Sequence, residues 1–160
     1  MTGRIIAAIA LASASAVSAS AMQQGGEAVT HYEATSGPAS IVDGFYEALS
    51  SKNEKLVRQL LADNVVIAEN GAAERSFAAY AEEHLGADMQ FMSGVKGKLK
   101  NRDEYVSGDL AVVVSEHELD GEFTTKPVRR HMIETVVLKR HDLGWRIEHV
   151  HWSSKDRPAD

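Results

Sequence analysis

The stretch GWRIEHVHWSS, residues 144–154, is the part of the sequence that decides the fold. It alternates polar and apolar side chains after a polar turn, which is typical of a β-strand. Successive strand residues point to opposite faces of a sheet, so His149 and His151 should share one face with Trp145 and Ile147. The alternation alone leaves open which of the two faces points into the protein.

The rest of the chain changes once, from a helical pattern to a strand pattern. Apolar residues recur at helical spacing in three segments with a short strand after the second, and four long strand segments follow. The expected helices are residues 38–51, 54–62 and 77–85, and the expected strands are 65–68, 95–106, 110–119, 128–139 and 144–154. Tight turns such as Asp120-Gly121 join the later strands and imply an antiparallel meander. We therefore expect an α+β fold, a cone-shaped curved antiparallel sheet with three N-terminal helices packed on its concave face.

The N-terminus has the features of a cleavable export signal. Arg4 precedes a short apolar run, and Ala19-Ser20-Ala21 is a small-x-small cleavage site. We expect cleavage after Ala21 and a periplasmic or secreted protein with no membrane segment after cleavage; an uncleaved anchor is the alternative. The expected organisation is a signal peptide at 1–21, a flexible linker at 22–37, one domain at 38–154 and a polar tail at 155–160.

Composition narrows the class of protein further. The net charge of −6 is spread along the chain, which argues against nucleic acid or an anionic membrane as a partner. There is no cysteine, so stability must come from an ordinary core without disulfides. We expect one globular domain that needs no cofactor.

Three segments resemble a known family. They are FYEALSSKNEKLVRQLLADNVVIAENG at 45–71, ETVVLKRHDLGWRI at 134–147 and HVHWSS at 149–154. They are similar to the SnoaL-like, nuclear-transport-factor-2-like superfamily, which also holds the ketosteroid isomerases. The resemblance covers residues 38–154 and implies the cone fold. It implies no single reaction, because this cone hosts isomerases, cyclases, dehydratases and non-catalytic binders.

The resemblance also implies roles for single residues. It places Glu69 where the isomerases have their proton-transferring carboxylate, and it marks His84 and Glu134 as recurring features of secreted members. The position of the oxyanion-binding tyrosine falls on Phe45, which cannot donate a hydrogen bond, and Tyr46 comes next.

The residue pattern itself gives candidate sites, each with a structural alternative. His84 lies on the apolar stripe of its helix, and Glu134 lies among apolar strand residues, where an arginine or a histidine should pair with it. His117 and His131 are expected at the sheet surface. The expected catalytic residues are Glu69 and His84, and the expected ligand contacts are Glu134, His149, His151, Tyr46, Tyr80 and Trp145.

Three functions remain open from the sequence. The first is an exported domain whose cavity binds a small, largely apolar molecule, with the sheet face forming a homodimer. The second is a proton-transfer enzyme of isomerase or dehydratase type with Glu69 as its base. The third is a zinc or copper protein, whose ligands would be Glu69, His84, His149 and His151.

Overall fold

The computed structural model describes residues 36–158, so the expected signal peptide and most of the expected linker lie outside the described residues. Four helices precede the long strands in this part of the chain: α1 (Pro38–Ser50), α2 (Glu54–Leu60), α3 (Phe77–Glu83) and α4 (Leu85–Gly94). The strands are β1 (Leu61–Glu69), β2 (Ala72–Glu74), β3 (Val95–Ser107), β4 (Leu110–Phe123), β5 (Lys126–His141) and β6 (Gly144–Asp156).

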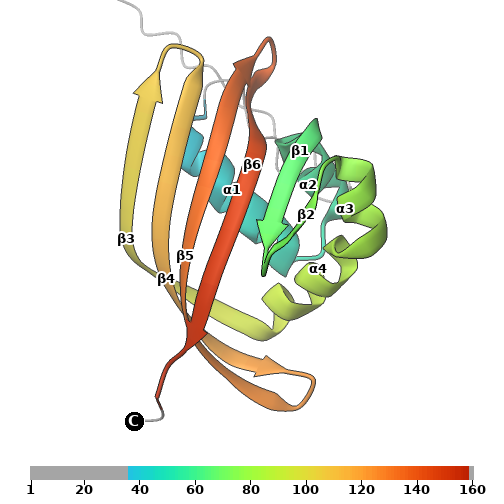
Figure 1. Ribbon diagram of the computed structural model, residues 1–160, viewed down its shortest axis with the longest axis vertical. Helices are drawn as coiled ribbons and strands as arrows, with labels where there is room; N and C mark the ends of the chain where they lie inside the picture. Colours follow the sequence, from blue (N-terminus) through green and yellow to red (C-terminus); the bar gives the residue numbers. More distant parts are fainter. Residues whose placement is uncertain (1–35, 159–160) are drawn as a thin grey trace, which may run out of the picture.

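The strands form one curved sheet in the order β2-β1-β6-β5-β4-β3 (Figure 1). The meander β3 to β6 is antiparallel, as expected, whereas β1 pairs with β6 in the parallel sense. The expectation of a wholly antiparallel sheet is therefore wrong at this one pairing. The long crossover from β1 through α3 and α4 to the meander makes it possible, because parallel neighbours need such a connection.

The helices gather on one face of the sheet, which we call the inner face (Figure 1). α1 contacts β4, β6, α2 and α4, so it lies across the middle of this face. The fourth helix was not expected, because Gly86 suggested a helix end there. Instead the chain leaves helical geometry for one residue at His84, and α4 begins at Leu85, which is buried. No helix in residues 36–158 is long and apolar enough to cross a membrane.

The β4–β5 hairpin is longer than the turn signal suggested. β4 continues through Asp120-Gly121 to Phe123, and the chain turns at Thr124 and Thr125, which both have positive φ. A side chain at Gly121 would overlap the carbonyl oxygen of Gly94 at the end of α4. The glycine therefore serves a close backbone approach rather than a turn.

The last strand contains a β-bulge that changes which residues share a face. Val137 of β5 pairs with His149, and the next residue, Leu138, pairs with Ile147, so Glu148 has no partner in β5. The extra residue reverses the alternation. Trp145 and Ile147 before the bulge are buried, and so are Val150 and Trp152 after it.

β6 also continues beyond the expected domain end. Lys155 and Asp156 pair with β5, and the backbone of Arg157 donates a hydrogen bond to the carbonyl oxygen of Arg129. The first residues of the expected polar tail therefore belong to the sheet.

Candidate functional site

A row of five residues crosses the inner face of the sheet at one level. Each residue of the row lies opposite the next in the strand register, and the row consists of Arg102, Ser115, Glu134, Trp152 and Glu69. Ser115 and Glu134 are fully buried, and the guanidinium of Arg102 donates a hydrogen bond to the hydroxyl of Ser115 (3.0 Å). The inner face of the sheet thus carries a polar stripe beneath the helices. Glu69 is the last residue of this stripe, at the end opposite Arg102.

Tyr46 of α1 lies above this row. Its hydroxyl donates a hydrogen bond to Glu134 and accepts one from the indole Nε1 of Trp152 (2.7 Å). The other carboxylate oxygen of Glu134 lies 3.4 Å from Nε2 of His117. Burial, together with the Glu134 carboxylate, raises the pKa of Tyr46 well above its ordinary value, so its hydroxyl stays protonated.

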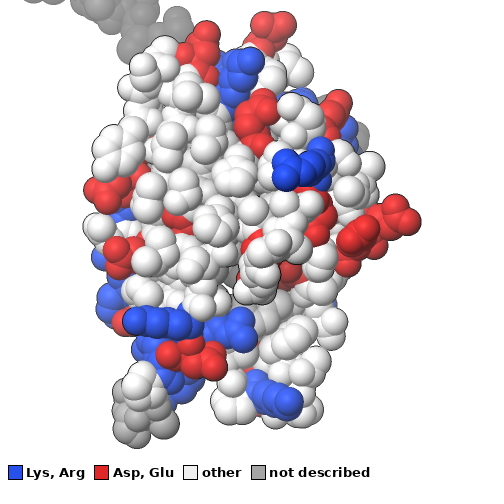
Figure 2. Space-filling view, viewed as in Figure 1, with Lys and Arg blue, Asp and Glu red and all other residues white. Residues whose placement is uncertain are grey.

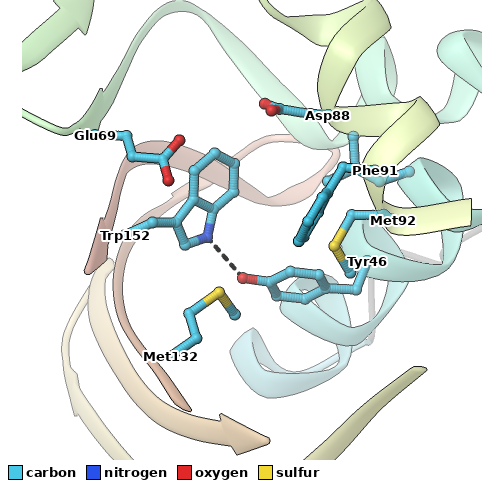
Figure 3. Close-up of a pocket in the computed structure, with 8 residues that line it drawn as sticks. Tyr46, Glu69, Asp88, Phe91, Met92, Met132 and Trp152 are labelled. Carbon is cyan, nitrogen blue, oxygen red and sulfur yellow. Dashed lines mark hydrogen bonds between the residues drawn. The ribbon is translucent and has the colours of Figure 1, made fainter. Parts of the chain in front are cut away.

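Tyr46 and Trp152 border a pocket between α1, α4 and the sheet (Figure 3). Its empty space is about 350 Å³, including the part open to solvent. The lining is mostly apolar, with two carboxylates and one phenol, and consists of Tyr46, Leu49, Glu69, Asp88, Phe91, Met92, Met132 and Trp152. Phe45 lies instead in the core, stacked on Trp152 with 6.2 Å between ring centroids. The phenol that borders the pocket is therefore Tyr46.

Asp88 is a carboxyl group of the pocket whose acidity is altered. Burial, and secondarily the charge of Glu69, raises its pKa to about 6, and a hydrogen bond from the Tyr80 hydroxyl (2.8 Å) acts in the opposite direction. Tyr80 is buried, and its own pKa is raised by burial and by Asp88. Near pH 6, Asp88 is close to the midpoint of its titration, which is favourable for acid–base chemistry.

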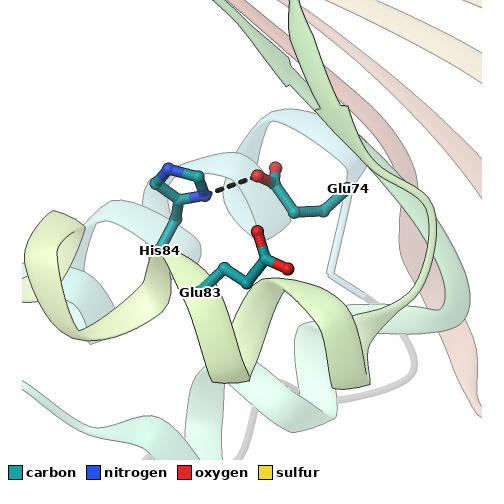
Figure 4. Close-up of side chains that lie close together, drawn as sticks. All are labelled: Glu74, Glu83 and His84. Atoms are coloured by element: carbon teal, nitrogen blue, oxygen red, sulfur yellow. Dashed lines mark ion pairs between the residues drawn. The ribbon is translucent and has the colours of Figure 1, made fainter.

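His84 does not line this pocket. Its Nδ1 lies 2.5 Å from a carboxylate oxygen of Glu74, and Glu83 lies beside the pair (Figure 4). The ligand atoms of these three residues lie within 4.8 Å of one another, and they form the one cluster of this kind in residues 36–158. The expected metal set of Glu69, His84, His149 and His151 is not brought together. His84 sits at the end of α3, where it meets Glu74 of the unexpected strand β2.

The expected contacts from the last strand also lie elsewhere. His149 and His151 share the outer face of the sheet, and His151 is exposed. Burial and the nearby His151 lower the pKa of His149. Trp145 is buried in the core away from the pocket, under the guanidinium of Arg140 at 4.5 Å. The bulge at Glu148 separates the histidines from Trp145 and Ile147, so the expectation of a common face is wrong.

Among the site residues that were not expected from the sequence are Trp152, Asp88 and His117. Trp152 was assigned to the face opposite the histidines, and the structure places this face on the inside of the sheet. Asp88 lies in a segment without a motif. Its partial burial follows from the packing of α4, which the sequence did not predict. His117 was expected at the surface, but it is buried, with 9% of its surface exposed. It shares a strand face with Ser115 and Leu119, which are also buried. The histidine partner expected for Glu134 is His117.

Comparison with known proteins agrees with the fold. A model of the SnoaL-like domain matches residues 39–156. A crystal structure of a candidate ketosteroid isomerase from Shewanella frigidimarina NCIMB 400 shares 39% identity and a TM-score of 0.71, over 75% of this chain and 97% of that chain. The chain therefore belongs to the SnoaL-like domain family, and the resemblance seen in residues 38–154 is confirmed.

More distant structures share the fold alone. A candidate dehydratase of the NTF2-like family from Streptomyces avermitilis has 19% identity and a TM-score of 0.60, over 74% of this chain and 94% of that chain. The CaMKII hub of S. rosetta has 19% identity and a TM-score of 0.61, over 75% of this chain and 98% of that chain. No protein with a curated description matches the chain significantly.

Proposed function

We propose that this domain binds a small, largely apolar molecule in the pocket between α1, α4 and the sheet. The observation that carries the proposal is the lining itself. Apolar side chains such as Phe91, Met132 and Trp152 surround a few convergent polar groups, the usual composition of a small-molecule site. Of the polar groups, Glu69 and Asp88 would orient an oxygen of the ligand, because the hydroxyl hydrogen of Tyr46 is already donated to Glu134.

A second function, proton transfer on a carbonyl compound, is favoured by the two carboxylates. Glu69 in its ionised form would take a proton from the carbon next to the carbonyl group, leaving an enolate. Asp88, with its pKa raised to about 6, is partly protonated near pH 6 and would donate a hydrogen bond to the enolate oxygen. If a carbon–carbon double bond adjoins that carbon, the enolate is conjugated with it. Returning the proton to the far end of the double bond would then shift the double bond next to the carbonyl group and isomerise the compound, as the name of the 39% identical protein suggests.

Deuterium exchange tests the two functions together. The probe is 2-tetralone, a compact apolar ketone, and NMR follows deuterium uptake at its α-carbons in D₂O. Enzyme-dependent exchange should fall about 100-fold or more in Glu69→Gln, while binding of 2-tetralone by calorimetry is retained. Glu122→Gln, an exposed carboxylate on the hairpin, is the matched control. Binding of 2-tetralone without exchange would support the binding function and contradict proton transfer. A failure of 2-tetralone to bind would contradict both functions.

We further propose that a second copy of the chain covers the outer face of the sheet. Figure 2 shows this face as largely uncharged over the middle of the meander. Its exposed apolar residues include Tyr105 (62%) and Ile133 (42%), around the half-buried Val137 and His149. Apolar faces of this kind mark interaction sites. An association domain with this fold, from Thiobacillus denitrificans, supports the idea that the fold assembles.

Export to the periplasm or medium remains part of the proposal and rests on residues 1–21. Intact-mass measurement of the protein purified from its own host tests it. We expect a chain that begins at Met22. A chain that retains Arg4 would contradict cleavage.

A further inference from the structure

A second cavity lies beside the pocket. It contains about 760 Å³ of empty space, including the part open to solvent, which is more than twice the space of the pocket. Its lining comes from α1, α4, β3, β4 and β5. The open space beside the pocket is thus larger than the space of the pocket itself.

The floor of the second cavity is apolar and partly uncovered. Leu99 pairs with the buried His117, so it belongs to the inner face, yet 46% of its surface is exposed. Gly97 pairs with the buried Leu119 and contributes no side chain. Exposed leucine on the inner face costs free energy that an apolar occupant would recover. Asp43, Glu47 and Ser50 of α1 make the opposite edge polar.

Three residues line both the pocket and the second cavity: Tyr46, Met92 and Met132. The two methionines flank the Tyr46 ring in the view of Figure 3. Two hydrogen bonds hold the Tyr46 hydroxyl, whereas methionine side chains are unbranched and adapt easily to a ligand. The partition between the two spaces is therefore movable at Met92 and Met132 and fixed at Tyr46.

We propose that the second cavity binds the unbranched alkyl or acyl chain of a ligand whose polar head occupies the pocket. The inference rests on the proposed binding function and adds the class of ligand. The preferred ligand is an elongated amphipathic molecule that passes between Met92 and Met132 and binds more tightly than a compact ring system confined to the pocket.

A series of 4-alkylphenols, from 4-methylphenol to 4-octylphenol, tests this with calorimetry on the full chain. Affinity should rise about fourfold per added methylene through the longer members. Gly97→Val places a side chain in the second cavity, where its Cβ meets Leu119 at 3.4 Å and His117 at 3.9 Å, both ordinary contacts. A β-branched residue also suits a strand. In Gly97→Val the shortest phenols should bind as in the wild type, and the rise should stop at a shorter chain.

Lys98→Val is the matched control, because it places the same side chain on the opposite, exposed face of β3. It should leave the whole series unchanged. An affinity that levels off after the first carbons in the wild type, or a Gly97→Val series parallel to the wild type, would overturn the inference while the binding function stands. Failure of every phenol, 4-methylphenol included, would contradict the binding function itself.

Discussion

The hydroxyl of Tyr46 donates a hydrogen bond to the carboxylate of Glu134, and this contact joins α1 to the middle of the sheet. Glu134 is fully buried, and the described residues bring it two polar partners, Tyr46 and His117. A buried carboxylate is expensive unless such partners stabilise its charge. The pair therefore fixes the position of the helix above the pocket as well as the polarity of the pocket wall.

Removing the Tyr46 hydroxyl should destabilise the fold. Tyr46→Phe keeps the ring but leaves Glu134 with one partner and the indole of Trp152 without its acceptor. We expect a loss of about 1–3 kcal/mol in the free energy of unfolding, measured by urea denaturation. Tyr105→Phe removes a hydroxyl from an exposed residue of the outer face and should change little. Equal stability of the two variants would contradict the structural role of the Tyr46–Glu134 contact.

Asp88 should make the stability of the domain depend on pH. Its folded-state pKa of about 6 lies above the ordinary aspartate pKa of 3.8, so the folded state binds the proton more tightly. This contribution to stability is complete below about pH 4 and is lost as the pH rises through 6. Asp88→Asn keeps an acceptor for Tyr80 without the charge. It should therefore match the wild type near pH 4 and exceed it by about 1 kcal/mol at pH 8, after discounting for partial exposure.

Thermal unfolding of both proteins at pH 4, 6 and 8 measures this difference. Asp142→Asn, an exposed aspartate in the β5–β6 turn, is the control and should show no such trend. A gap between Asp88→Asn and the wild type that stays constant with pH would show that the Asp88 carboxylate titrates normally.

Charge placed on the outer face should prevent the proposed pairing of two copies. In Val137→Arg, a guanidinium would replace an apolar side chain at the centre of this face, between Val112 and His149 in the strand register. Light scattering after size exclusion should give a dimer for the wild type and a monomer for the variant. Leu143→Arg changes an apolar residue that is 79% exposed in the β5–β6 turn and should leave the dimer intact. A monomeric wild type would contradict the proposed pairing of two copies.

Much of the fold followed from local patterns, because apolar spacing reports burial directly. The spacing of Ile41, Val42, Phe45 and Leu49 predicted α1, and all four are buried. Local patterns were wrong where a tertiary contact decided the geometry. Gly121 resembled a turn residue, but Gly94 requires its small size. The fourth helix was missed for a similar reason. Gly86 resembled a helix end, whereas α4 begins at Leu85, which is buried.

The site was less predictable for the same reason. Glu69, Tyr46 and Glu134 were expected site residues, and the structure brings them to one level of the inner face. His149, His151 and Trp145 were assigned by strict alternation, which one unpaired residue at Glu148 invalidates. No count of strand residues reveals a bulge in advance, because its position depends on the partner strand.

NMR of the two tryptophan indoles tests the central claim most directly. Trp152 borders the pocket and donates its indole hydrogen to Tyr46, whereas Trp145 lies in the core away from it. In ¹H–¹⁵N spectra of the protein titrated with 4-methylphenol, we predict a saturable shift of the Trp152 indole resonance and a constant Trp145 resonance, with assignment by Trp145→Phe. A Trp152 resonance that does not move at saturating phenol, or a shift confined to Trp145, would contradict binding in this pocket.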